Sequence, residues 1–228
     1  TPAWLRLRVA ETLLRPIEAA LLPGIAAHYV ARKTWFWRAA RAAVANGAER
    51  VVVFAPGCDG IGPALRAFGV DVIEVVHPHE AAAREQLAAD EAGVTRVVAD
   101  LAEAAAVMRE LAAEPRPTLW IAEAVLMYLA PDAARALLRG LREARAPQTV
   151  LFSAMLPGED GSAGFRRASP WIARWLASVR EPFRWALPAD ALRRVLAREG
   201  FGVIESANES ATPGFCSGEA MFVACRSR

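Results

Sequence analysis

Short runs of apolar, mostly β-branched residues recur along the chain, and segments with helical periodicity separate them. The clearest run covers residues 50–55 and is continuously apolar after Arg50, which is typical of a strand buried on both faces of a parallel sheet. The same pattern predicts further strands over Asp71–Val76, Thr95–Ala99, Thr118–Ala122 and Thr149–Ala154, and two last strands near Phe201–Glu205 and Ala220–Cys225.

Helical spacing occupies the intervals between these runs. Apolar residues four positions apart predict a helix over Trp4–Leu22, and a second helix runs from about Ile25 to Ala45, where Asn46-Gly47 stops it. Further helices are predicted before Phe68, over Glu80–Ala92, over Leu101–Ala113, from Pro131, over Trp171–Val179 and over Pro188–Gly200. Repeated strand–helix units imply right-handed crossovers and a doubly wound, mostly parallel α/β sheet.

Composition narrows the functional classes. The 228 residues are 54% hydrophobic and 23% charged, so the chain can bury a large core, and a formal net charge of +2 gives no basis for nucleic-acid binding. Three widely spaced cysteines form neither a disulfide framework nor a paired-cysteine zinc site, and we expect no metal. No apolar run approaches the ~20 residues that cross a bilayer. We therefore expect a soluble, cytoplasmic protein with no membrane partner.

Candidate ligand-binding residues follow the strands, because open α/β sheets bind ligands beyond the carboxyl ends of their strands. Gly57 opens a glycine-containing loop after the first strand, although the loop lacks the Gly-x-Gly-x-x-Gly spacing of dinucleotide sites and is also compatible with a plain turn. Asp100 follows the third strand and is equally compatible with a helix N-cap. Glu123 follows the fourth strand, where an unpaired carboxylate is costly, so we expect it to meet a cation or several donors.

These segments resemble the leucine carboxyl methyltransferase family of S-adenosylmethionine-dependent O-methyltransferases. Residues 118–129, Thr-Leu-Trp-Ile-Ala-Glu-Ala-Val-Leu-Met-Tyr-Leu, followed by Pro131, are similar to the family signature TLWIAEGLLMYL-x-P. The segments 28–32, 55–59, 74–78, 99–101 and 183–187 are similar, in order, to the family's Tyr-x-Ala-Arg, Gly-x-Gly-x-Asp, Glu-Val-Asp-x-Pro, Asp-Leu and Phe-x-Trp-Gly-Leu stretches.

The resemblance implies the cofactor S-adenosylmethionine, with S-adenosylhomocysteine as product, and a Rossmann-like class I methyltransferase fold. It places Arg32 on the methionyl carboxylate, Glu123 on the methionyl ammonium and Gly57 in close approach to the ligand. It places Asp100 on the adenine amino group, with Leu101 as a backbone donor and apolar contact. Ala55 and Asp59 complete the first loop of the implied site.

Two positions depart from the family pattern, and both concern the cofactor. Ala55 stands where the family has the first glycine of its loop. Val76 stands where the family has the carboxylate that holds the ribose hydroxyls, with Glu74 one pleat deeper and His77 as a weaker hydrogen-bonding substitute. Losing charged hydrogen bonds of about 1.5–3 kcal/mol each would weaken binding by one to several orders of magnitude.

The resemblance also predicts the organisation of a single domain with a seven-stranded sheet and one antiparallel strand near the carboxyl end. Residues 1–48 form N-terminal helices, 49–156 the cofactor-binding core, 157–187 a cap insertion, and 188–228 a closing helix and hairpin.

The implied reaction is O-methylation of a carboxylate, or of a hydroxyl, on a small metabolite, of the kind found in bacterial secondary metabolism. A hydroxyl acceptor needs a general base, and His28 and Tyr128 are the candidates. Aromatic residues are expected to line the acceptor pocket or to form ordinary core; they are Tyr29, Trp35, Tyr128, Phe165, Trp171, Trp175, Phe183 and Trp185. Two alternatives stay open: a weakened or non-catalytic binding protein, and an enzyme that uses the fold for another reaction.

Overall fold

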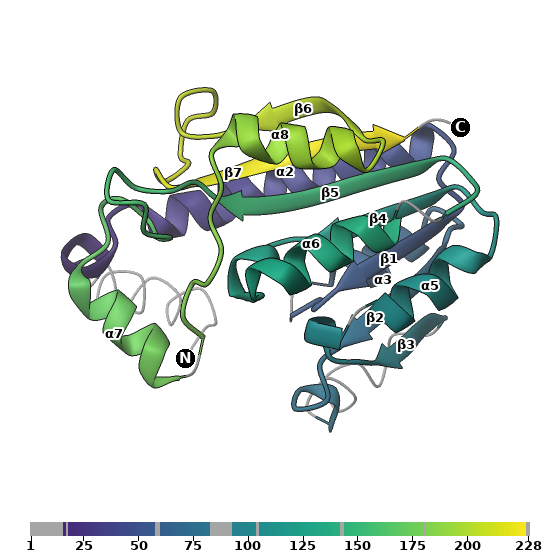
Figure 1. The fold of residues 1–228 in the computed structure, drawn as a ribbon, viewed down its shortest axis with the longest axis horizontal. Helices are drawn as coiled ribbons and strands as arrows, with labels where there is room; N and C mark the ends of the chain where they lie inside the picture. The colour runs from purple at the N-terminus through teal and green to yellow at the C-terminus, as the bar shows by residue number, and fades with distance from the viewer. Residues whose placement is uncertain are drawn as a thin grey trace, which may run out of the picture.

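A computed structural model describes residues 16, 18–57, 60–82, 93–103, 105–141, 144–179 and 181–226. Most of the helix predicted over Trp4–Leu22, most of that over Glu80–Ala92, and Asp59 lie outside the described residues. The described chain forms a seven-stranded sheet in the order β3-β2-β1-β4-β5-β7-β6 (Figure 1). The strands are β1 Arg50–Phe54, β2 Asp71–Val76, β3 Val94–Val98, β4 Thr118–Ala122, β5 Gln148–Met155, β6 Gly202–Ala207 and β7 Glu219–Arg226.

The sheet is parallel from β3 to β5, and β7 runs antiparallel to both of its neighbours. The prediction of a mostly parallel, seven-stranded sheet with an antiparallel strand near the carboxyl end is therefore confirmed. Because β7 is antiparallel, its first residue, Glu219, lies at the same edge as the last residues of the parallel strands, opposite Met155 of β5. An acidic residue at this end of β7 thus enters the neighbourhood where ligands bind in such sheets.

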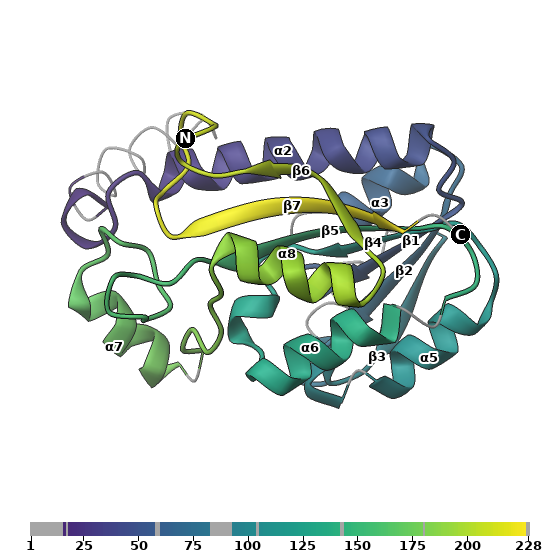
Figure 2. The same cartoon turned by 45° about the horizontal axis from the view of Figure 1, so that its top comes forward.

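Helices cover both faces of the sheet (Figure 2). One buried cluster joins α2 and α3 to the side chains of β1, β2 and β4 that include Val51, Val72 and Leu119. The other joins the remaining core helices to the opposite faces of the strands through Trp120 and Phe152. The described helices are α2 Ile25–Ala45, α3 Ile61–Arg66, η1 Leu101–Glu103, α5 Ala105–Ala113, η2 Leu126–Tyr128, α6 Pro131–Gly140, α7 Pro170–Ser178 and α8 Ala189–Arg198.

Two features differ from the pattern-based expectations. The helix expected over Leu101–Ala113 is divided into a 3₁₀ turn and α5, because apolar periodicity does not distinguish a tight first turn from an α-helical one. Trp35 and Trp185, expected among the walls of an acceptor pocket, are buried in the two core clusters instead.

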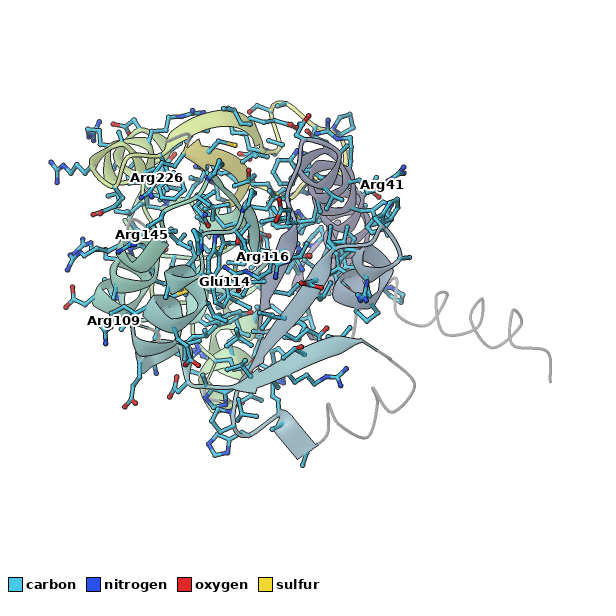
Figure 3. All side chains as sticks on the ribbon, turned by 90° about the vertical axis from the view of Figure 1, so that its right-hand side faces the viewer. Arg41, Arg109, Glu114, Arg116, Arg145 and Arg226 are labelled. Atoms are coloured by element: carbon cyan, nitrogen blue, oxygen red, sulfur yellow. The ribbon has the colours of Figure 1, made fainter. Side chains whose placement is uncertain are left out.

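The opposite end of the molecule is a polar, ion-paired edge at the starts of the parallel strands. Figure 3 shows Glu114 and Arg116 on this side, and Arg116 contacts Asp71 across 2.7 Å. Arg50 donates to the carboxylate of Glu114 at 3.0 Å, so these contacts tie strand starts together at the edge opposite Glu123. None of the helices described by the structure is both apolar and long enough to span a bilayer.

Candidate functional site

A cavity of about 250 Å³ lies beyond the ends of β1 and β4. It is lined by Tyr29, Arg32, Lys33, Val53, Phe54, Ala55, Pro56, Gly57, Ile61, Ile121, Glu123 and Ala124. Helix α2 thus supplies cationic side chains from one side, and the loops after β1 and β4 supply backbone and a carboxylate from the other. Four of the residues that the sequence places in the cofactor site, Arg32, Ala55, Gly57 and Glu123, meet here.

Arg32 and Glu123 form the polar centre of this cavity. Nε of Arg32 donates to Oε1 of Glu123 across 2.9 Å, and Nζ of Lys33 lies 2.8 Å from the same oxygen. Both side chains of the central pair are largely buried, with Arg32 13% and Glu123 7% exposed. Among the described residues, the second carboxylate oxygen, Oε2, is buried and has no hydrogen-bond partner. Glu123 therefore meets cations as expected and keeps one acceptor available to another group.

The backbone beside this pair has an unusual conformation at two alanines. Ala55, directly after β1, has φ = 44°, and Ala124, directly after Glu123, has φ = 52°. Left-handed conformations favour glycine, so each alanine carries local strain of the order of 1 kcal/mol. Gly57 also has positive φ, and a Cβ built on it would meet no described atom within 4 Å. The first loop thus turns sharply and leaves space in front of its backbone.

Sequence reasoning missed Glu219, which lies behind the Arg32–Glu123 pair. Its side chain is fully buried, and its Oε2 accepts from Nη1 of Arg32 at 3.2 Å and contacts Nε2 of His28 at 2.6 Å. Burial by itself would raise the pKa of Glu219, but hydrogen bonds with His28 and Ser153 and the charge of Arg32 together hold that pKa below its usual range. The sequence held one signal that could have indicated Glu219: it is an acidic residue at the start of the otherwise apolar segment 219–225.

His28 does not face the cavity, contrary to its consideration as a catalytic base. The ring is fully buried, Nδ1 accepts from the backbone N–H of Cys216 at 2.9 Å, and Nε2 contacts Glu219. With both nitrogens engaged inside the protein, His28 is a structural histidine. Tyr128 remains near the site, although burial, together with the charges of Glu181 and Glu219, raises the pKa of its phenol.

Glu74 and Val76 of β2 are not arranged as the ribose-binding site implied by the family resemblance would require. Glu74 is fully buried and accepts from Nε of Arg96 at 3.3 Å, so its carboxylate is directed toward β3. It also packs beside Gly62, where an added Cβ would lie only 2.9 Å from Oε1 of Glu74. Val76 is buried at the end of β2 and presents no polar group.

The residues implied for the adenine and ribose lie beside the cavity but are not among its lining residues. His77 and Asp100, at the ends of β2 and β3, are partly exposed, with Nε2 of His77 3.9 Å from Oδ2 of Asp100. Leu101 is buried beneath them at the start of η1. The structure therefore brings together the residues expected around the methionyl group, and leaves those expected around the nucleoside on the adjoining surface.

A second, larger cavity adjoins the first and shares Arg32 and Ala124 with it. It has a volume of about 530 Å³ and lies between α2, η2 and the segment that contains α7. Its walls are mainly apolar and are formed by Glu18, Leu21, Leu22, Ile25, Ala26, Arg32, Ala124, Met127, Tyr128, Phe165, Ile172, Trp175, Leu176 and Phe183. Of the expected aromatic walls, Tyr29 lines the first cavity, while Trp171 is an exposed residue of α7.

The model of the family described as leucine carboxyl methyltransferase matches residues 4–142, which is more than half of the chain. The chain belongs to the leucine carboxyl methyltransferase family. Membership of this family agrees with the expected enzyme class, a methyltransferase that uses S-adenosylmethionine. No curated protein matches the chain.

Solved structures share the fold of this family member at low sequence identity. Magnesium protoporphyrin IX methyltransferase from Synechocystis PCC 6803, solved with bound S-adenosylhomocysteine, aligns with a TM-score of 0.58 and 14% identity over 88% of this chain and 86% of its own. The 1,6-didemethyltoxoflavin-N1-methyltransferase of Burkholderia thailandensis aligns with a TM-score of 0.54 and 17% identity over 97% and 90%. The pyocyanin biosynthetic protein PhzM aligns with a TM-score of 0.50 and 16% identity over 79% of this chain, which spans only 51% of that protein.

The cavity fits one part of S-adenosylmethionine on the evidence of this chain's own atoms. The buried, unpartnered Oε2 of Glu123 suits an ammonium group, and the adjacent guanidinium of Arg32 suits a carboxylate. The open space before Gly57 suits close approach of a ligand to the backbone. The nucleoside part has a poorer fit, because Val76 offers no hydrogen bond and Glu74 is engaged by Arg96.

Proposed function

We propose that this family member transfers a methyl group from S-adenosylmethionine to the carboxylate of a small, largely apolar metabolite. The cofactor supplies, when bound, an electrophilic methyl group on a sulfonium. Arg32 and Glu123 hold its amino-acid group, Gly57 lets it approach β1, and Asp100, Leu101 and His77 contact its nucleoside. The observation that carries the proposal is the buried free oxygen of Glu123 beside the guanidinium of Arg32, in a cavity that adjoins an apolar one.

The shape and chemistry of the second cavity support an apolar acceptor. Tyr128, Trp175 and Phe183 give it aromatic walls, and Arg32, at its junction with the first cavity, attracts an anionic group toward the position from which the methyl is transferred. Methyl transfer is an in-line displacement, so aligning the acceptor oxygen with the methyl carbon lowers the barrier. In this proposal the donor occupies the first cavity and the acceptor the second, and Arg32 and Ala124 line both.

A carboxylate is favoured over a hydroxyl as the methyl acceptor. A carboxylate is already ionised near neutral pH and needs no base, whereas a hydroxyl must lose a proton during transfer. Both ring nitrogens of His28 are occupied away from the cavity, and the raised pKa of the Tyr128 phenol makes it a poor base at neutral pH. Neither of the two candidate bases considered from the sequence is therefore well suited to deprotonate a hydroxyl.

This proposal can be tested with methyl-labelled S-adenosylmethionine. The acceptors are matched sets of aromatic carboxylic acids, phenols and amines. The expected product from the acids is a methyl ester, which mild base hydrolyses to labelled methanol, whereas ethers and N-methyl groups survive the same treatment. Label found only in the products from phenols or amines would contradict a carboxylate acceptor and would indicate a hydroxyl or an amine instead. Failure of every acceptor to accept label, with S-adenosylhomocysteine still bound, would favour another reaction.

A binding protein without methyltransferase activity is the second candidate, and one observation favours it. Val76 removes the expected ribose carboxylate, and Glu74 is held by Arg96 at the neighbouring strand. Such a protein would bind the apolar ligand without a productive cofactor. Calorimetric titration separates the two candidates, because binding of the apolar acids in the absence of any binding of S-adenosylmethionine or S-adenosylhomocysteine supports the second.

A further inference from the structure

Glu219 lies outside every motif that carries the family resemblance, yet its fully buried carboxylate connects three elements beside the candidate site. Its Oε2 contacts His28 and Arg32 of α2, and it lies beside Ser153 of β5, which helps to lower its pKa. Burying a carboxylate is costly unless charged or hydrogen-bonded partners compensate it; His28 and Arg32 do so at Oε2, whereas Oε1 is buried and has no hydrogen-bond partner among the described residues. The arrangement is therefore a built network and not an isolated charge.

We propose that Glu219 is a positioning residue, which sets Arg32 and the turn after Glu123 in the geometry that receives the methionyl group of S-adenosylmethionine. The inference rests on the proposed function of the cavity. Glu219 is not itself a lining residue of the cavity and does not touch the reacting atoms in this assignment; it acts through Arg32, which does line the cavity.

The first connection runs through Arg32. Its guanidinium is held at Nε by Glu123 and at Nη1 by Glu219, so two carboxylates fix its plane. A guanidinium fixed in this way keeps its remaining N–H groups pre-oriented for a carboxylate ligand. Without Glu219, the charge of Arg32 is balanced mainly by Glu123, which then has less freedom to accept an ammonium.

The second connection runs through Ser153. Its Oγ accepts the backbone N–H of Ala124 at 2.9 Å, and its hydroxyl lies close enough to Glu219 to lower the pKa of that carboxyl. Ala124 has the strained left-handed conformation that directs the chain after Glu123, and such a conformation persists only where its surroundings hold it. Glu219 thus lies beside the residue that holds the Glu123 turn.

His28 anchors the network. Because its Nδ1 accepts the Cys216 N–H, the hydrogen-bond pattern assigns the ring proton to Nε2, which donates to Glu219. The charges of the inner network also balance: Arg32 and Lys33 face Glu123 and Glu219. A methionyl group carries both charges, so it adds to this cluster without leaving a net charge uncompensated.

Glu219→Gln keeps the size of the side chain and removes its charge, and S-adenosylhomocysteine is the probe. We expect its Kd, measured by calorimetry, to rise about tenfold or more in the variant. Glu205→Gln is the matched control, since Glu205 of β6 also accepts from side chains of α2, Trp35 and Arg38, and none of these three residues lines the cavity. A Kd unchanged in Glu219→Gln, even with a lower melting temperature, would overturn the inference.

A double-mutant cycle with Ser153→Ala adds a second readout, the coupling between the effects of the two substitutions on the Kd. A merely structural role of Glu219 would not produce this coupling. We expect Ser153→Ala to raise the Kd about threefold or more in the wild-type background and to have less effect beside Glu219→Gln, because both act on the same turn. If Glu219→Gln does not fold, Ser153→Ala decides, and a wild-type Kd in that variant overturns the inference. Absence of binding by the wild-type chain itself would instead refute the proposed function, so the two failures are distinct.

Discussion

Nε of Arg32, on α2, lies 2.9 Å from Oε1 of Glu123, at the end of β4, although 91 residues separate them in the chain. This contact joins an N-terminal helix to the central strand of the sheet. Glu219, at the start of the antiparallel strand β7, closes the network from behind. The candidate methionyl site is therefore an assembly of three elements around two carboxylates.

Arg32→Ala and Glu123→Ala should each weaken binding of S-adenosylhomocysteine by roughly tenfold to a hundredfold. Each change removes a charged hydrogen-bonding partner, worth about 1.5–3 kcal/mol, from the ligand. Calorimetric titration measures the effect, with Arg38→Ala on the same helix as a control. Wild-type affinity in either variant would remove that residue from the site.

Gly57→Ala should weaken cofactor binding, because the new Cβ would enter the open space before the β1 loop. The substitution also strains a backbone with φ = 60°. Gly47→Ala imposes comparable strain at φ = 98° at the far end of α2, where a Cβ likewise meets no described atom within 4 Å. Both variants should lose about 1 kcal/mol of unfolding free energy, and only Gly57→Ala should raise the Kd. Equal affinities in the two variants would contradict close approach at Gly57.

Val76→Asp should tighten the S-adenosylhomocysteine complex if the ribose contact is simply missing. Because Val76 is buried at the end of β2, the same change should lower the melting temperature in the absence of ligand. Val76→Asn is the control, since it has the same shape without the charge. A looser complex with aspartate than with asparagine would show that the ribose does not lie at β2.

The fold and part of the site could be predicted from the sequence for physical reasons. Strong apolar runs and Asn46-Gly47 define α2, β2 and β4 with the bounds that the structure has. Arg32 and Glu123 could be paired only through the family resemblance, because their contact depends on how distant segments pack. Glu219 was missed for the same reason: the predicted strand began one residue later, at Ala220, and only the observed antiparallel pairing with β5 places Glu219 at the ligand-binding edge.

The lowered pKa of Glu219 also predicts how stability depends on pH. The pKa of a glutamate in the unfolded chain is about 4.3, and the pKa of Glu219 in the folded protein lies below this value. The stabilisation from this ionised carboxylate is therefore complete above the unfolded pKa and is lost as the pH falls through the folded pKa. Urea unfolding from neutral to acidic pH should show a shallower loss of stability in Glu219→Gln than in the wild type. Parallel curves would contradict the assigned ionisation.

A crystal structure of the complex with S-adenosylhomocysteine tests the central claim most directly. The account predicts the ligand's ammonium within hydrogen-bonding distance of Oε2 of Glu123 and its carboxylate on the guanidinium of Arg32. A ligand bound elsewhere on the protein, with the cavity between Arg32, Gly57 and Glu123 empty, would contradict it.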